Sequence, residues 1–247
     1  MDLQTSGRGP RTDTNYTSKE NKMQYEGVTK GIFLARPNRF VAQVQLPQGQ
    51  VTAHVKNTGR CKELLVPGTA VWLEPGKTPG RKTPWDLVTV EKEGRLFNLD
   101  SQAPNKVFGE WAQSGGFVPD LDLLRPETVY GDSRFDFYWQ AGQRKGFVEV
   151  KGVTLEREGV LYFPDAPTQR GIRHLQQLAL CRAEGYEAAV CFVIQTDQAR
   201  YFSPNPDRPE FAQALRQAAA AGVQVLAVRC VVTPDSLSIR EAVEVRL

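Results

Sequence analysis

The sequence predicts an α/β protein, α+β overall, built as a small antiparallel β-barrel followed by an α/β domain. Short strands of alternating polarity fill residues 31–98, and no helical pattern separates them. After residue 99, amphipathic helical patterns alternate with continuous apolar runs, as in domains built on a parallel sheet. The chain has 247 residues, of which 40% are hydrophobic and 24% charged, so it is long enough to bury a core in each part.

The composition of residues 1–25 predicts a disordered extension, because this segment is rich in Ser, Thr, Asn, Gly and Lys and lacks apolar periodicity. This segment has no apolar centre of the kind that a signal peptide needs, and no later apolar run approaches the length of a bilayer span. We therefore expect a cytoplasmic protein without a membrane partner. The four cysteines are widely spaced and, with two histidines, fit no zinc-ligand pattern, which indicates small buried side chains in a reducing compartment.

Residues 26–98 predict an OB-like barrel. Roughly five strands in about 70 residues is the pattern of a small closed sheet, and the OB-fold is the best-known nucleic-acid-binding barrel of this size. The clearest alternation of apolar and polar residues occurs at 39–46, 50–55, 70–74 and 85–90.

Two glycine-containing turns of this barrel carry basic side chains. Backbone amides, cations and nearby aromatic rings suit a nucleic-acid backbone and unstacked bases. Residues 1–97 hold 15 Lys and Arg against 9 Asp and Glu, a net charge of +6, whereas residues 98–247 hold 16 against 19, a net charge of −3. Ordinary turns and a chance segregation of charge are the alternative. The candidate nucleic-acid contacts are Lys56, Asn57, Thr58, Arg60, Arg81 and Lys82.

Residues 99–247 predict an α/β domain. Val107 and Trp111 form the apolar stripe of a short helix at 104–112. A helix between two buried strands implies a right-handed parallel crossover. In chain order, the expected elements are strands at 133–139 and 146–153, a helix at 168–184, a strand at 188–194, a helix at 211–221 and a strand at 223–228.

Two carboxylates and one ammonium fall on the first two strands of this domain. Glu149 and Lys151 share one strand face, about 6.6 Å apart along the strand. Asp136 lies among aromatic strand formers, where burying a carboxylate is costly without a compensating cation. Asp136 and Glu149 would hold Mg2+ or Mn2+, and Lys151 would stabilise charge on a phosphodiester attacked by water. The alternative is a solvated Glu–Lys pair worth a few tenths of a kcal/mol.

Further polar residues lie where they could support such a site. Glu110 adjoins the apolar stripe of the first helix and is a third candidate metal ligand, or a solvated helix residue. Gln195 follows a buried strand at its carboxyl end, where ligands of open α/β sheets bind, or it caps that strand. Asp165 precedes the helix at 168–184, which Asp165 or Thr168 could cap. Arg170 and His174 on that helix could face phosphate, although a lone helical histidine is more often structural.

A series of ordered blocks then resembles the signature of the sugar fermentation stimulation protein A (SfsA) family, over residues 31–245. The blocks are Arg39 with Phe40, Asn-Thr-Gly-Arg at 57–60, Arg-Lys-Thr-Pro-Trp at 81–85, Tyr-Gly-Asp-Ser-Arg-Phe-Asp-Phe at 130–137, Val-Glu-Val-Lys at 148–151, Phe-Pro-Asp-Ala at 163–166 and Arg-Gly-Ile-Arg-His-Leu at 170–175.

The resemblance implies an OB-like barrel at 26–98 and, at 99–247, a restriction-endonuclease-like domain similar to the PD-(D/E)xK nucleases. It also implies DNA binding with weak sequence selectivity. The nuclease pattern places its metal carboxylates at Asp136 and Glu149 and its lysine at Lys151, and it matches Glu110 less securely. Arg134 and Arg170 complete the candidate nucleic-acid contacts.

We therefore predict a DNA-binding protein with a divalent-metal-dependent phosphodiesterase site. One alternative is a transcriptional regulator of sugar metabolism that keeps the nuclease fold without catalysis. Another is a general binder of RNA or of a small anion. Whether the chain forms a homodimer stays open.

Overall fold

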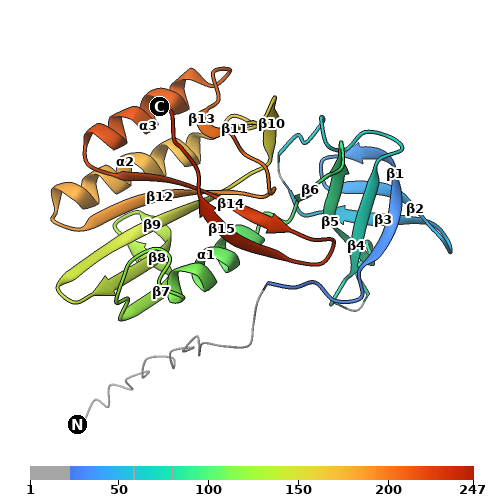
Figure 1. Cartoon of the computed structure of the whole chain (residues 1–247), viewed down its shortest axis with the longest axis horizontal. Coiled ribbons are helices and arrows are strands. Elements are labelled where there is room, and N and C mark those ends of the chain that lie inside the picture. The colour runs from blue at the N-terminus through green and yellow to red at the C-terminus, as the bar shows by residue number, and fades with distance from the viewer. Residues whose placement is uncertain (1–22, 58, 79) are drawn as a thin grey trace, which may run out of the picture.

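The computed structural model describes residues 23–57, 59–78 and 80–247, which form a β-barrel beside an α/β domain (Figure 1). The predicted fold class is confirmed, because a closed barrel precedes a domain that combines a mixed sheet with three helices among these residues. Residues 1–22, which make up most of the predicted extension, lie outside the described residues, as does Thr58.

Five strands close the barrel. The pairs β1–β2, β2–β3, β1–β4 and β4–β5 are antiparallel. The parallel pair β3–β5 completes the ring, in the order β1-β2-β3-β5-β4-β1. The alternating inward side chains, such as Val44 and Leu73, fill its interior. The strands are β1 (Thr29–Asn38), β2 (Val41–Leu46), β3 (Gly49–Val55), β4 (Ala70–Pro75), β5 (Trp85–Lys92) and β6 (Arg95–Asn98). Strand β6 pairs with β5, and its Phe97 forms an isolated bridge to Thr196 of the α/β domain.

The α/β domain is built on a six-stranded sheet of order β15-β14-β12-β9-β8-β7. The strands β9, β12 and β14 are parallel, so the expected parallel crossover between the apolar strands is confirmed. The elements are α1 (Ala103–Gln113), β7 (Leu123–Tyr130), β8 (Ser133–Ala141), β9 (Arg144–Val153), α2 (Gln169–Ala183), β12 (Glu187–Ile194), α3 (Pro209–Ala220), β14 (Gln224–Val232) and β15 (Leu237–Ala242). A smaller sheet contains β10 (Leu155–Arg157), β11 (Val160–Phe163) and β13 (Tyr201–Pro204).

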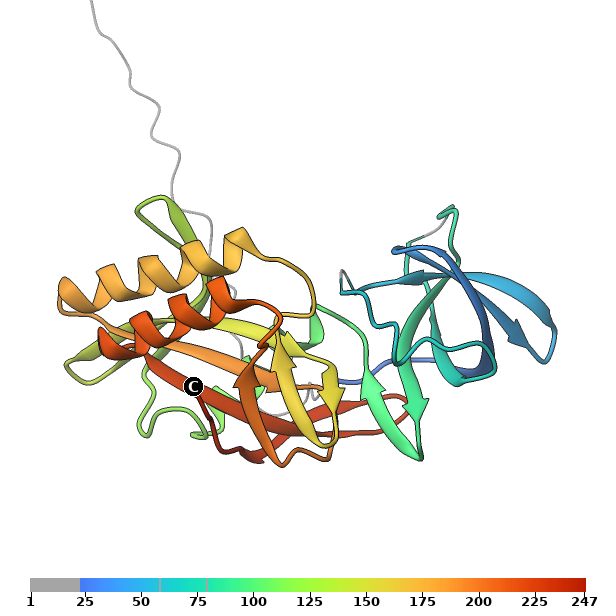
Figure 2. The same ribbon diagram turned by 90° about the horizontal axis from the view of Figure 1, so that it is seen from above.

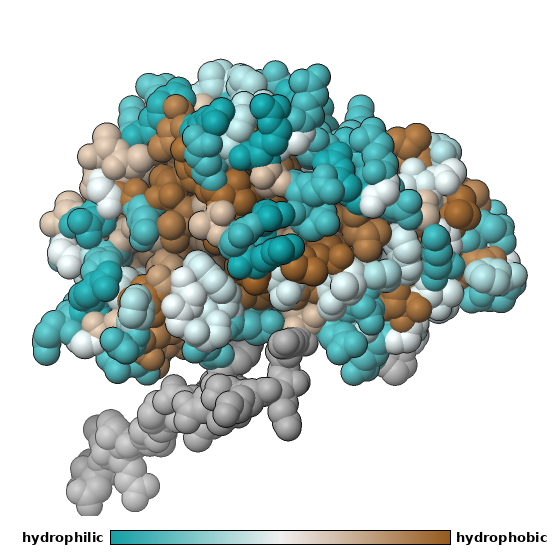
Figure 3. All heavy atoms as spheres, in the orientation of Figure 1, coloured by the Kyte–Doolittle hydropathy of each residue, from teal (hydrophilic) through white to brown (hydrophobic). Residues whose placement is uncertain are grey.

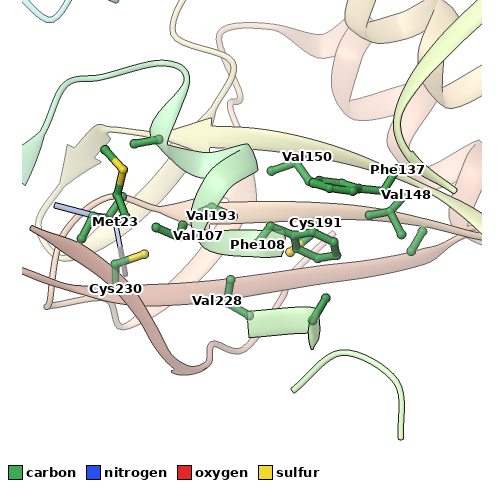
Figure 4. Packing of buried hydrophobic residues seen from close by; sticks show 14 of the residues in the cluster. Met23, Val107, Phe108, Phe137, Val148, Val150, Cys191, Val193, Val228 and Cys230 are labelled. Carbon is green, nitrogen blue, oxygen red and sulfur yellow. The ribbon is translucent and has the colours of Figure 1, made fainter. Parts of the chain in front are cut away.

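Helices cover both faces of the six-stranded sheet, α2 and α3 on one side and α1 on the other (Figure 1). Strand β9 contributes alternate residues to the two cores. Val148 and Val150 pack with Phe108 of α1, in the cluster drawn in Figure 4. Phe147 belongs to the opposite cluster, together with Leu175 of α2. The predicted alternation of side chains along this strand is therefore confirmed.

The chain already belongs to the fold at Met23. The exposed fractions of Met23 and Tyr25 are only 6% and 4%, and the Tyr25 hydroxyl accepts a hydrogen bond of 2.9 Å from Asn98. This corrects the predicted extension at its end, because Met23 and Tyr25 join the core. Two apolar side chains in a polar stretch produce no periodicity, so the pattern could not reveal them.

Two smaller expectations are also met, one for the cap of α2 and one for the cysteines. Thr168 caps α2, with its hydroxyl accepting the Gly171 amide at 3.0 Å. All four cysteines are free and buried.

The face of the molecule in Figure 3 is mainly hydrophilic at its edge, with apolar side chains gathered toward its middle. No helix among the described residues has the length and apolar character needed to cross a membrane.

Candidate metal and phosphodiester site

Asp136 lies where strands β8 and β9 separate. Their backbone ladder ends at the pair Phe137 and Val148, and beyond it the Asp136 carboxylate replaces a strand partner by accepting the Val150 amide at 2.7 Å. The other carboxylate oxygen accepts a hydrogen bond of 2.8 Å from the Asn105 side chain on α1. The two bonds orient the carboxylate from both sides.

Glu149 is held from α2 and from its own strand. Its exposed fraction is 2%, and its Oε1 contacts both the Lys151 ammonium and His174 Nδ1. Arg170 Nε donates to His174 Nε2 at 3.3 Å. Because a guanidinium can only donate, Nε2 must accept, which assigns the proton to Nδ1 and makes His174 a donor to Glu149. The structure thus brings Arg170 and His174 to the predicted Glu149–Lys151 pair.

The two carboxyl groups have opposite pKa shifts. Burial, and then the charge of Glu149, raise the pKa of Asp136 above its usual value. Burial also acts to raise the pKa of Glu149, but the hydrogen bond from His174 and the charge of Lys151 outweigh it, so that pKa is lowered. Such separation of neighbouring carboxyls by their environments is typical of functional sites.

The donor set fits a hard divalent cation. Oε2 of Glu149 is buried and has no hydrogen-bond partner, an arrangement that costs free energy unless a cation or a donor reaches it. Asp136 supplies the second carboxylate. The described part of the chain contains no cluster of three or more His, Cys, Asp or Glu side chains that could hold a metal. Two carboxylates suit Mg2+ or Mn2+, since such ions keep several water ligands and bind substrate phosphate as well.

Two other candidates, Glu110 and Gln195, form hydrogen bonds with residues outside the Glu149–Lys151 pair. Glu110 accepts the Met23 amide at 3.1 Å, and Asn105 is an α1 residue that donates a hydrogen bond to Asp136. Sequence reasoning missed Asn105, whose only signal is a polar residue in the first turn of that helix. Gln195, with an exposed fraction of 1%, donates to Asn98 Oδ1 at 2.9 Å and to the Asp100 carbonyl at 3.0 Å. It therefore joins the α/β domain to the end of the barrel.

Some of the candidate nucleic-acid contacts are engaged within the protein. Lys56 forms an ion pair with the buried Asp100. Arg81 binds Asp86 through two nitrogens, at 2.6 and 3.0 Å, and so holds the loop before β5. On β8, the exposed Arg134 lies 3.0 Å from Glu127 of the neighbouring strand β7. These cations have structural partners and are less free to meet phosphate.

The loop after β3 keeps its basic side chain exposed. Asn57 accepts the Gly59 amide at 2.7 Å, while the Arg60 side chain points into solvent without an ion pair to any described residue. Lys82 is exposed in the same way. Asp165, from the loop before α2, accepts the amides of Arg60 and Cys61, the latter at 3.2 Å. It thus ties a barrel loop to the α/β domain, a role that its sequence position did not reveal.

Comparison with known proteins gives a consistent assignment. The family model described as "Sugar fermentation stimulation protein RE domain" matches residues 102–236, and the one described as "SfsA N-terminal OB domain" matches residues 34–99. A sugar fermentation stimulation protein homolog of Desulfitobacterium hafniense (strain Y51) is 51% identical over 226 residues, covering 91% of this chain and 99% of that protein. The homolog of Clostridium beijerinckii is 47% identical over 226 residues, covering 91% and 100%.

A solved structure is similar over nearly the whole chain. It is described as "The structure of Pyrococcus Furiosus SfsA in complex with Ca2+" and is 26% identical in sequence, with a TM-score of 0.82. The match covers 93% of this chain and 100% of that one.

Proposed function

The chain belongs to the sugar fermentation stimulation protein family, and we propose that it is a DNA-binding protein whose α/β domain carries a divalent-metal-dependent phosphodiesterase site. The observation that carries the proposal is the buried Glu149 carboxylate. One of its oxygens has no partner, and Asp136 and Lys151 lie beside it.

Each side chain has a defined task in this proposal. Asp136 and Glu149 would hold the cation, which supplies an activated water and polarises a phosphoryl oxygen. Asn105 and the Val150 amide orient Asp136, while the His174 donor orients Glu149. Lys151 would turn from Glu149 toward the phosphate and stabilise the charge that develops on its oxygens.

The related archaeal structure supports the choice of a divalent cation, since it is described as a complex with Ca2+. Ca2+ and Mg2+ both prefer oxygen ligands, although Ca2+ takes more of them and at longer distances. The Asp136 and Glu149 oxygens are of that type. Arg60 and Lys82 are exposed cations of the barrel loops, and such cations support contact with a polyanion.

A second candidate function is a DNA-binding regulator of sugar metabolism without catalysis. It is favoured by the contacts of Glu149 Oε1, which faces both Lys151 and His174. The site is thus already charge-compensated without a metal, which a binding platform would also need.

The deciding experiment combines binding and cleavage. Labelled single-stranded and double-stranded DNA are incubated with the protein and with Mg2+ or Mn2+, beside the Lys151→Ala variant. Lys145→Ala is the matched control, because Lys145 is exposed on the same strand and its ammonium lies 4.9 Å from the centroid of the Tyr186 ring instead of facing a carboxylate.

We expect metal-dependent cleavage by the protein and by the control, and DNA binding without cleavage by Lys151→Ala. Tight DNA binding by all three proteins with no cleavage of any substrate would contradict the phosphodiesterase and support the regulator. Competition between DNA and RNA at several salt concentrations tests the general-binder alternative, in which RNA would compete equally well.

A further inference from the structure

An aromatic ring is presented on the barrel surface by a fixed piece of backbone. Phe40, in the turn between β1 and β2, has an exposed fraction of 44%. Its amide donates to Asn38 Oδ1 at 2.9 Å, and its carbonyl accepts the Val55 amide at 2.8 Å. Because both backbone groups are engaged, a ligand that contacts the ring orders little additional chain on binding.

A cation accompanies this ring. The Arg39 guanidinium lies 4.7 Å from the centroid of the Phe40 ring. It has no ion pair to any residue in the described part of the chain. An exposed aromatic ring beside an unpaired arginine offers a stacking face for a base and a cation for the adjoining phosphate.

Arg36 joins this turn to the loop after β3. Its guanidinium donates to the carbonyls of Arg39 at 2.6 Å, of Asn57 at 3.3 Å and of Gly59 at 3.2 Å, and it also contacts the Arg60 carbonyl. One partly buried cation thus binds the backbones of two loops. The two loops that carry the exposed residues Arg39, Phe40 and Arg60 are therefore held next to each other.

The same loop leads toward the α/β domain, as Figure 2 shows. Asp165 accepts the amides of Arg60 and Cys61 and lies three residues before Thr168, the N-cap of α2. In the first turns of α2, Arg170 donates to His174, which in turn contacts Glu149. A continuous path of hydrogen bonds and backbone therefore connects the barrel surface with the carboxylate site.

We propose that Arg39, Phe40 and Arg60 form a docking surface for single-stranded nucleic acid, with one unstacked base against the Phe40 ring and the strand continuing past the Asp165 loop toward Asp136 and Glu149. This proposal rests on the DNA-binding function proposed above and names the strand type that its site takes. A ring can pack on the face of a base only where that base has left a stack, so a duplex cannot use Phe40 in this way.

The test measures affinity by fluorescence anisotropy in EDTA, which prevents metal-dependent cleavage. The probes are a labelled single-stranded oligodeoxynucleotide, its duplex, and an RNA strand of the same sequence. Phe40→Ala should weaken binding of the single strands by about fivefold to 150-fold, the contribution of one stacked base, and should change duplex binding little. Phe40→Tyr should restore the affinity, because tyrosine also offers an aromatic face.

Two matched controls separate stacking and charge from general damage. Val66→Ala removes another exposed apolar side chain of the barrel, with an exposed fraction of 48%, and should leave all affinities unchanged. Arg60→Ala should reduce the slope of log K against log salt by about 0.7 on single strands. Arg144→Ala should not, since Arg144 lies at the β8–β9 hairpin and pairs with Glu187.

Equal weakening on single strands and duplex, or less than a twofold effect of Phe40→Ala, would overturn the docking surface while leaving the DNA-binding function intact. Absence of binding to every probe by the unmodified protein would overturn the proposed function as well. A preference between the DNA and RNA strands would identify which of the two sources of single strand the surface favours.

Discussion

Replacing Asp136 with asparagine should have opposite effects on stability with and without metal. The exchange preserves shape, and its amide can still accept from the Val150 amide and hydrogen-bond with the Asn105 side chain after that side chain flips. The lost group is a charge that burial and the neighbouring Glu149 both disfavour, since each raises the pKa of Asp136. A raised carboxyl pKa means that ionisation weakens the fold at neutral pH. We therefore expect metal-free Asp136→Asn to be more stable than the unmodified protein.

Metal should reverse this order. A ligand that binds only the folded state at 100 times its Kd stabilises it by about 2.7 kcal/mol. For a chain of this length, that gain corresponds to a rise in Tm of about 5 to 11 °C. Loss of one of two carboxylate ligands should weaken metal affinity by at least about a hundredfold, more than is typical for an outer partner of a ligand. The variant would then gain only about 0.4 kcal/mol, or about 1 to 2 °C.

The assay is thermal denaturation over a titration of Mg2+ or Mn2+, with chelator for the metal-free point. Asp132→Asn is the control, because it makes the same chemical change in the exposed turn between β7 and β8 and should follow the unmodified protein at every concentration. A loss of metal-free stability in Asp136→Asn would show that its carboxylate is a structural anchor. An equal rise in Tm for both proteins would remove Asp136 from the metal site.

Three further outcomes are expected. Lys92 and Arg95, at 2.8 and 3.2 Å from Glu156, and the Gly159 amide outweigh the effect of burial and lower the pKa of Glu156. The ionised Glu156 therefore stabilises the fold fully above about pH 4.5, the usual pKa of a glutamate, and this stabilisation is lost as pH falls through the lower folded-state pKa. Glu156→Gln should therefore make the free energy of unfolding, measured by urea denaturation, fall less steeply at acid pH. An unchanged fall at acid pH would contradict this. Gly152→Ala should lower stability by about 1–3 kcal/mol, because the new Cβ would lie 2.5 Å from Gln195 Oε1; no loss in the same assay would argue against that contact. Gly109→Ala should instead raise stability by about 0.5–1 kcal/mol, since its Cβ meets only the ring of Phe137 at 3.6 Å and alanine favours the helix, and a destabilised variant would refute this.

Local periodicity accounts for the elements that sequence reasoning recovered. The buried strand at 188–194 corresponds to β12, and the helix at 168–184 corresponds to α2 with Thr168 as its cap. No residue range was predicted for strands β1, β6, β7, β10, β11, β13 and β15, because they are short, irregular, partly exposed or placed at sheet edges, where alternation of polarity is weak.

In the candidate site too, the sequence predicted the contacts within one strand but not those between distant elements. The period of two along β9 placed Glu149 and Lys151 on one face, and the contact between them follows. No pattern could indicate that Asn105 would orient Asp136 or that His174 would donate to Glu149, because those partners come from helices packed on opposite faces of the sheet.

By itself the sequence determined the class of the fold, the alternation within each strand, and which residues offer carboxylate and ammonium groups. Tertiary structure alone decided which cations are engaged and which stay exposed: Lys56 and Arg81 are paired with Asp100 and Asp86, whereas Arg60 projects from a loop held by Arg36 and Asp165. The physical reason is the separation along the chain over which each interaction acts. Propensity and periodicity act between neighbours in the chain, but burial and charge pairing depend on residues brought together from distant segments when the two domains pack.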